Sequence, residues 1–355
     1  MKTFWSLILA AAAAAQVPVF QSAARIVEVP VLARNARNSP VADLKISDLH
    51  LLDNGVEQSI VSLERFGGPG PLRASGNAIP DSLGSRLGPR SSILLLDILN
   101  TPLPDQIRGQ NGISEMLRKV RQDQDKTAIY VLAEELRSLS NFTTDAEILR
   151  AVIDHYPAEQ LPIGAVAPPP VTGRVSPLGA PAPPRDPESI RLAEQRLEIT
   201  LDAFSRIASR MKTLPGEKSL VWMTAGFPPP GDPQRFYAVI EQLRAAKVRL
   251  YPIDARGLLA CIPLPCPPWV SLNIDLMEEL AHQTGGRAYH DSNGLSASVR
   301  SALEDSRQGY LLTYAPNNYR RDGAAHKVEL QTSRKGIELR YRSGYVADSA
   351  AGRLF

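Results

Sequence analysis

The stretch Ser91–Thr101, which reads SSILLLDILNT, constrains the fold more than any other part of the chain. Its apolar run has the length of a fully buried strand, and it ends at Asp97, with Asn100 and Thr101 just beyond. In an open α/β sheet, ligands bind outside the carboxyl ends of the strands. A carboxylate, an amide and a hydroxyl at such a place could hold a hard cation through oxygen ligands. The alternative is a structural Asp97, which caps the next helix or accepts hydrogen bonds from backbone amides.

Apolar runs and helical periodicities alternate along residues 91–306. Strands separated by helices predict an α/β fold, here a doubly wound, mainly parallel sheet with helices on both faces and one antiparallel strand. Strands are expected at 93–97, 128–132, 137–142 (the antiparallel one), 219–224, 248–253 and 287–290. Helices are expected at 106–120, after the cap at 143–145, at 188–212, 233–246 and 272–283, and around 295–303.

Two β-rich segments flank this region, at residues 25–66 and 307–347. Neither can bury a face alone, so we expect both chain ends to form one small β-sandwich. Residues 67–90, rich in Gly, Pro and Ser, are expected to be a linker. Residues 157–187 are dense in proline and predict an insertion within the α/β region, either a disordered loop or an extended docking arm.

The N-terminus has the features of an export signal. Lys2 is followed by a short apolar core and an alanine run ending at Ala15, so residues 1–15 are expected to be a signal peptide. The apolar run is too short to span a bilayer, and no stable membrane span is expected after cleavage. The mature chain should then be periplasmic or secreted, where Cys261 and Cys266 could form a local disulfide, the alternative being free thiols.

Charge and motifs exclude several classes of function. The net charge is only +3, and basic residues are interleaved with acidic ones, which argues against a nucleic-acid partner. The chain has no Gly-x-Ser-x-Gly elbow, Walker loop, dinucleotide-binding glycine motif or His-Glu-x-x-His motif. We therefore expect no enzyme, although a Ser-His-Asp site assembled from distant loops stays open as an alternative.

Several phrases, taken in their order, resemble the von Willebrand factor type A domain and, more extensively, the acidobacterial-type VWFA-related domain family. They are LLLDILNT, VWMTAGFP, YPIDARGL, LAHQTGGRA, GYLLTYAP and RYRSGY, and they cover most of residues 25–347. The resemblance implies the fold described above. It also implies binding through a metal-ion-dependent adhesion site, built from an Asp-x-Ser-x-Ser loop, a distant Thr and a second Asp.

Carried over onto this sequence, that adhesion site is degenerate. Asp97 matches the first Asp and Thr101 the second Ser, whereas Leu99 stands at the first Ser and cannot ligate. No carboxylate lies near Thr224, where the second Asp is expected, and the loop for the Thr coincides with the proline-rich insertion. One carboxylate and one hydroxyl give at best a weak Mg²⁺ or Mn²⁺ site.

The sequence thus predicts an exported protein-binding or scaffolding module without a required cofactor, whose protein partner is unknown. We expect its binding rim to comprise Asp97, Asn100, Thr101, Thr224 and Asp254, the last of which could instead be a turn residue bonding its own backbone. The main alternative is a Mg²⁺- or Mn²⁺-dependent adhesion module in which the cation binds a partner carboxylate. A cryptic hydrolase is the third.

Overall fold

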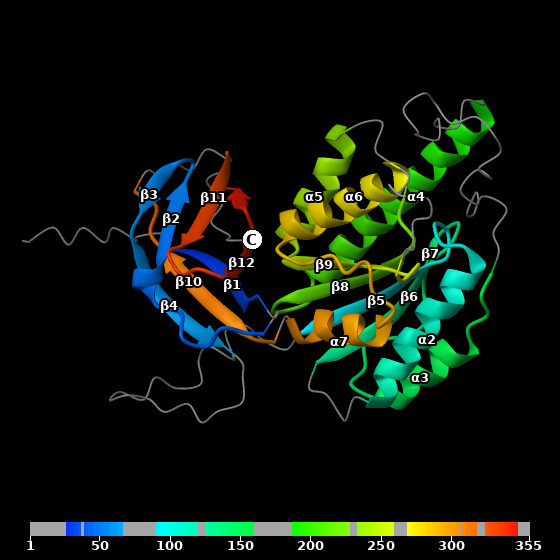
Figure 1. Cartoon of the computed structure of the whole chain (residues 1–355). Helices are drawn as coiled ribbons and strands as arrows, with labels where there is room; N and C mark the ends of the chain where they lie inside the picture. Colours follow the sequence, from blue (N-terminus) through cyan, green and yellow to red (C-terminus); the bar gives the residue numbers. More distant parts are fainter. Residues whose placement is uncertain are drawn as a thin grey trace, which may run out of the picture.

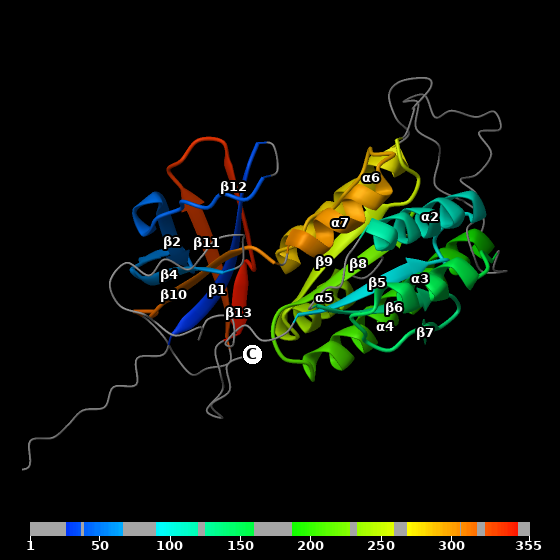
Figure 2. The same ribbon diagram turned by 90° about the horizontal axis from the view of Figure 1, so that it is seen from below.

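The computed structural model describes residues 26–36, 39–66, 90–119, 125–159, 187–227, 233–258, 268–305, 307–317 and 324–346. The expected signal peptide, nearly all of the linker and insertion, and both cysteines lie outside these residues. Two bodies lie side by side, one built mainly of strands and one of a sheet with helices (Figures 1 and 2). Within the described part of the chain, no helix is both long enough and apolar enough to cross a bilayer.

The helix-covered body contains a mixed, mainly parallel five-stranded sheet, here called the central sheet, with the strand order β7-β6-β5-β8-β9. β5 pairs in parallel with β6 and β8, and β9 continues the parallel set, whereas β7 pairs with β6 in antiparallel fashion. Every residue of β5, β8 and β9 is buried, as the continuous apolar runs predict. The strands are β5 Ser91–Asp97, β6 Lys126–Leu132, β7 Leu136–Ser138, β8 Lys218–Thr224 and β9 Val248–Asp254.

Helices cover both faces of the central sheet, and each face has its own hydrophobic core. Above the sheet in Figure 1 lie α4, α5 and α6, whose buried side chains include Phe204, Phe236 and Leu280. Below it lie α2, α3 and α7, which contribute Met116 and Val299 among others. The helices are α2 Leu103–Lys119, α3 Ala146–His155, α4 Pro187–Lys212, α5 Pro233–Ala245, α6 Pro268–Thr284 and α7 Leu295–Asp305.

The second body, here called the strand sandwich, joins strands from the two ends of the chain. One antiparallel sheet has the order β12-β1-β10-β4 and the other β13-β11-β2-β3, and side chains such as Val31, Leu51 and Leu312 fill the core between them. A short 3-10 helix, Ile46–Asp48, leads into β2. The strands are β1 Val27–Asn35, β2 Leu49–Asp53, β3 Val56–Gln58, β4 Ile60–Phe66, β10 Gly309–Tyr314, β11 Ala325–Thr332, β12 Ile337–Tyr341 and β13 Gly344–Val346.

Two expected strands are shorter than the sequence predicts. The antiparallel strand expected at 137–142 is only Leu136–Ser138. The strand expected at 287–290 is reduced to one bridge, in which Tyr289 pairs with Ile253. The chain turns away immediately afterwards, because Asp291 adopts a left-handed conformation with φ of 52°.

Candidate functional site

Asp97 ends β5 at the carboxyl edge of the central sheet, and its carboxylate accepts hydrogen bonds on both oxygens. Oδ1 accepts from the backbone N and the side-chain Nδ2 of Asn100, at 2.9 and 3.1 Å. Oδ2 accepts from Asn100 Nδ2 at 2.9 Å, from Trp222 Nε1 at 3.0 Å and from Thr224 Oγ1 at 2.9 Å. The bond from the Asn100 amide is the backbone hydrogen bond that the structural interpretation of Asp97 predicts.

The donors around Asp97 come from two parts of the chain. Trp222 and Thr224 end β8, the neighbouring parallel strand, and Asn100 belongs to the loop that follows β5. Asn100 Nδ2 also donates to Thr200 Oγ1 of α4 at 3.0 Å, which connects the loop to the upper helix layer. Thr101 Oγ1 accepts from the backbone N of Ala225 at 3.1 Å and so joins the loop to the end of β8.

Burial dominates the electrostatics of Asp97. It raises the pKa of this carboxyl from its ordinary 3.8 to about 6, because loss of hydration outweighs the hydrogen bonds from Asn100, Thr224 and Trp222. Arg196 of α4, one helical turn before Thr200, lies within electrostatic range of Asp97, while burial lowers the pKa of its own guanidinium. The hydrogen-bond donors therefore only partly offset the loss of hydration of the charge at the end of β5.

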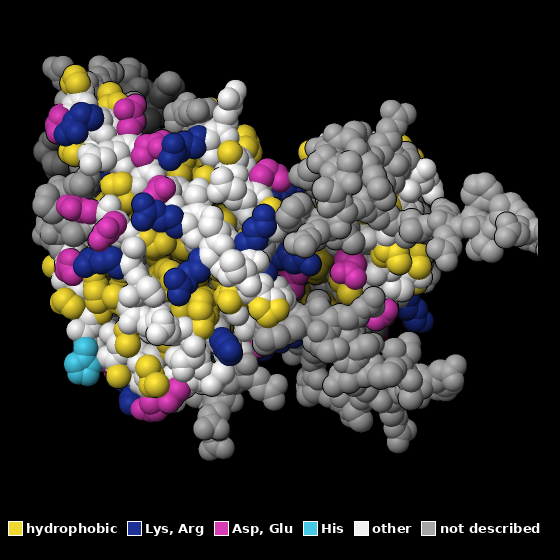
Figure 3. Space-filling model, turned by 180° about the vertical axis from the view of Figure 1, so that it is seen from behind, with side chains coloured by type: hydrophobic (Ala, Val, Ile, Leu, Met, Phe, Trp, Pro, Cys, Tyr) yellow, Lys and Arg dark blue, Asp and Glu magenta, His cyan; other side chains and the backbone are white. Residues whose placement is uncertain are grey.

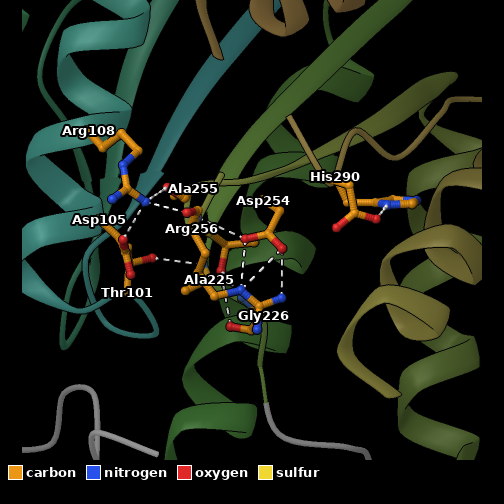
Figure 4. A network of polar contacts seen from close by, with 11 residues as sticks. Thr101, Asp105, Arg108, Ala225, Gly226, Asp254, Ala255, Arg256 and His290 are labelled. Atoms are coloured by element: carbon orange, nitrogen blue, oxygen red, sulfur yellow. Dashed lines mark hydrogen bonds and ion pairs between the residues drawn. The ribbon is translucent and has the colours of Figure 1, made fainter. Parts of the chain in front are cut away.

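A second carboxylate, Asp254, ends β9 and is held by its own loop (Figure 4). Its Oδ1 accepts from the backbone N of Arg256 at 2.9 Å, and its Oδ2 accepts from Arg256 Nη2 at 2.7 Å. The turn bond confirms the structural alternative for Asp254. Arg108 of α2 pairs with Asp105 at 2.9 Å and donates to the carbonyls of Ala255 and Arg256, so the start of α2 is fixed against the end of β9.

The five residues expected to form an exposed binding rim do lie along the carboxyl edge, but all five are buried. Asp97, Asn100 and Thr224 form one hydrogen-bonded network, Thr101 accepts from the backbone of Ala225, and Asp254 bonds to Arg256. Neighbouring residues of β8, α4 and the loops enclose these side chains, and their direct contact with a partner stays a prediction. They form a frame beneath the surface.

Apolar side chains are exposed at the same edge. Leu103 and Ile107 lie on the first two turns of α2, and Leu258 follows the Asp254–Arg256 turn with 59% of its surface exposed. Arg108 joins these two segments through its bonds to the carbonyls of Ala255 and Arg256. We call Leu103, Ile107, Arg108 and Leu258 the edge surface.

The residues at Asp97 do not fit the cation that the adhesion-site resemblance implies. A cation needs free oxygen lone pairs, whereas both oxygens of Asp97 face N–H and O–H donors. Leu99 is fully buried in the upper core, and Thr101 already accepts a backbone N–H. Across the described ranges, no group of three or more His, Cys, Asp or Glu side chains is placed to hold a metal ion.

Several residues of this network carry no recognisable sequence motif. Trp222 and Thr200 reach Asp97 and Asn100 from distant segments. Gln106 of α2 is buried, donates to the carbonyl of Glu159 at 2.8 Å and accepts from its backbone N at 3.0 Å. The chain is thus attached to the edge at the beginning of the proline-rich segment 157–187.

Comparisons with known proteins give only distant likenesses. No protein-family model and no curated protein matches the chain. An aerotolerance-related membrane protein from Bacteroides fragilis is 15% identical over 61% of this chain and 98% of that one, with a TM-score of 0.39. BatB from Bacteroides thetaiotaomicron is 14% identical over 61% and 97%, with a TM-score of 0.35. Proximal thread matrix protein 1 from the mussel byssus is 10% identical over 61% and 48%, with a TM-score of 0.38. Scores this low carry no argument about function.

Proposed function

We propose that this chain is a VWA-like protein-binding or scaffolding module that binds its partner through the edge surface. The observation that carries the proposal is the contrast at one sheet edge between exposed apolar side chains and a rigid, buried polar frame. Leu103, Ile107 and Leu258 are exposed, and the hydrogen bonds of Asp97 and Asp254 fix the loops that present them. These side chains are about half exposed, so burying one of them in an interface supplies about half of the 1.5–3 kcal/mol expected for a fully exposed side chain.

The proposal assigns no metal ion to Asp97. Support comes from the donors that surround its carboxylate. Calorimetric titration of the chelator-treated protein with Mg²⁺, Mn²⁺ and Ca²⁺ should show no saturable heat. Saturable binding that Asp97→Ala abolishes would instead establish the cation-dependent adhesion module.

The remaining parts of the proposal rest on sequence and surface. The face in Figure 3 carries Lys and Arg interspersed with Asp, Glu and apolar side chains, as suits a protein partner better than a nucleic acid. The motif survey of the sequence supports a binding module and not an enzyme. The features of residues 1–15 support a periplasmic or secreted location, and residues 157–187 stand as an insertion in a VWA-like unit spanning 91–306.

A site-specific crosslinking experiment tests the proposed surface. A photoreactive amino acid replaces Ile107 at the edge surface, and in a matched protein it replaces Ile148, which is equally exposed on α3 but lies at the opposite edge of the sheet. In the producing cells we expect a discrete adduct from position 107 that Leu258→Glu suppresses, and none from position 148. Equal adducts from both positions, or an adduct from 148 alone, would contradict the proposal.

A further inference from the structure

A second polar cluster lies where the strand sandwich meets the helix-covered sheet. Asp305, the last residue of α7, is buried and pairs with two arginines of the sandwich. Its Oδ2 is 2.9 Å from Arg340 Nη1 of β12, and its Oδ1 pairs with Arg34 Nη2 of β1. One carboxylate of the sheet body therefore joins two strands of the other body.

Glu217, just before β8, forms the same kind of contact a short distance away. Its Oε2 is 2.5 Å from Arg342 Nη2, which follows β12, and 3.4 Å from Arg249 Nη2 of β9. Arg249 is fully buried and lies within electrostatic range of Asp305 as well. We call the two carboxylates, these four arginines and the neighbouring Tyr251 and Tyr289 the junction cluster.

Positive charge exceeds negative charge in the junction cluster. Four arginines face two buried carboxylates, and the third acid nearby, Glu338, has 60% of its side chain exposed to solvent. Buried charges are costly unless they are paired, so an excess of buried guanidinium groups calls for a counter-charge.

Hydrogen-bond donors in the junction cluster also lack acceptors. Arg249 Nη1, Arg34 Nε and the hydroxyls of Tyr251 and Tyr289 are buried without a well-aligned hydrogen bond among the described residues, and Arg249 and Tyr251 lie within bonding range of each other. Burial, reinforced by the charge of Asp305, raises the pKa of both tyrosines, so both hydroxyls keep their protons at neutral pH. Unpaired buried polar groups are rare in native proteins, because each costs about 1–3 kcal/mol.

We infer that the junction cluster binds one small monovalent inorganic anion of the halide class, held by Arg249, Tyr251 and Tyr289. An anion supplies both the missing acceptor and the missing negative charge, whereas water supplies only the acceptor. A surface cavity of about 310 Å³, lined by Asn35, Arg287 and Glu338 among others, opens beside the cluster. Arg287, which lines this cavity, also lies over the ring of Tyr289, 5.5 Å from its centre.

Bromide is the probe for this site, because its anomalous scattering distinguishes it from water. A crystal of the full chain grown in sodium bromide should show an anomalous peak within hydrogen-bond distance of Tyr289 Oη and the Arg249 guanidinium. Density without anomalous signal at that place would identify water and overturn the inference.

A solution titration tests the same site without a crystal. At constant ionic strength, with sodium gluconate as the replacement salt, bromide should raise the unfolding midpoint saturably. Tyr289→Phe removes one donor with little change of shape and should weaken the apparent bromide affinity about tenfold or more. Tyr237→Phe, at an exposed position of α5, is the control and should behave like wild type. The same bromide dependence in all three proteins would contradict the site.

Discussion

Replacing Asp97 by asparagine tests how the carboxyl edge is built, through the pH dependence of stability. In the folded protein the pKa of Asp97 is raised from 3.8 to about 6, because burial outweighs the hydrogen bonds that its oxygens accept. The folded state therefore binds a proton more tightly than the unfolded chain does. Stability must then increase as the pH falls through 6, and the gain is complete below 3.8.

The magnitude follows from the size of that shift. The difference between 3.8 and about 6 is about two pKa units, and each unit corresponds to about 1.4 kcal/mol, so the gain is about 3 kcal/mol. The asparagine that replaces Asp97 does not titrate, and the other ionisable groups are common to both proteins. The free energy of unfolding of wild type, minus that of Asp97→Asn, should thus rise by about 2.4 kcal/mol between pH 7 and pH 4, with the remainder of the gain appearing only below pH 4.

Urea unfolding, followed by circular dichroism across this pH range, measures that difference. Asp275→Asn, at an exposed position of α6, serves as the control, and its difference from wild type should stay constant. If the difference for Asp97→Asn instead decreased on acidification, the hydrogen bonds would outweigh burial. If the difference did not change with pH, Asp97 would be hydrated, and the conclusion that it is buried at the carboxyl edge would be wrong.

Three further outcomes are expected. Glu217→Gln leaves buried arginines without their charge partner and should lower the free energy of unfolding by about 3–5 kcal/mol in urea titrations. Burial lowers the pKa of His290, but its bonds to Asp291 and Glu278 outweigh burial and raise the pKa above 6.5. The stabilising effect of His290 is therefore present below pH 6.5 and is lost as the pH rises through the folded pKa. The free energy of unfolding of wild type, minus that of His290→Gln, should decrease as the pH rises through this range. Gly286→Ala would place a Cβ 2.0 Å from the Leu250 carbonyl oxygen and should prevent folding. Gly294→Ala is the control and should fold, because the nearest neighbour of its Cβ is 3.4 Å away. Thermal melts and expression levels measure both outcomes.

Much of the arrangement at the edge follows from local sequence. The apolar run before Asp97 has the composition of a buried strand, and the structure places its end at the carboxyl edge. The cap at 143–145 is also confirmed, because Asp145 accepts from the backbone N of Glu147 at 2.9 Å. Asp254 bonds to the backbone two residues ahead, as an Asp before a turn is expected to do.

The rest depends on contacts between distant segments. Trp222 packs as an apolar side chain in the upper core, and nothing in its own strand indicates that its N–H points at Asp97. Thr200 lies on α4, about a hundred residues from Asn100, so its role appears only after α4 packs on the sheet. The burial of the expected rim has the same origin, because each side chain is enclosed by elements far away in sequence.

The same limit applies to the junction cluster. Arg34, Arg249 and Arg340 read in the sequence as isolated charges on three β-strands, and Asp305 as a polar residue at the end of a helix. Arg34 and Arg340 pair with Asp305 because α7 ends against β1 and β12 of the strand sandwich, whereas Arg249 pairs with Glu217. A pattern read along one segment cannot show that charges from four segments share a buried site.

The most direct test of a metal-independent binding edge is crosslinking from position 107 in the presence of excess EDTA. A partner held by Leu103, Ile107 and Leu258 requires no cation, so the adduct should form in the same yield with and without the chelator. An adduct that disappears in EDTA and returns with Mg²⁺ or Mn²⁺ would contradict this, and would make Asp97 a ligand instead of part of a buried frame.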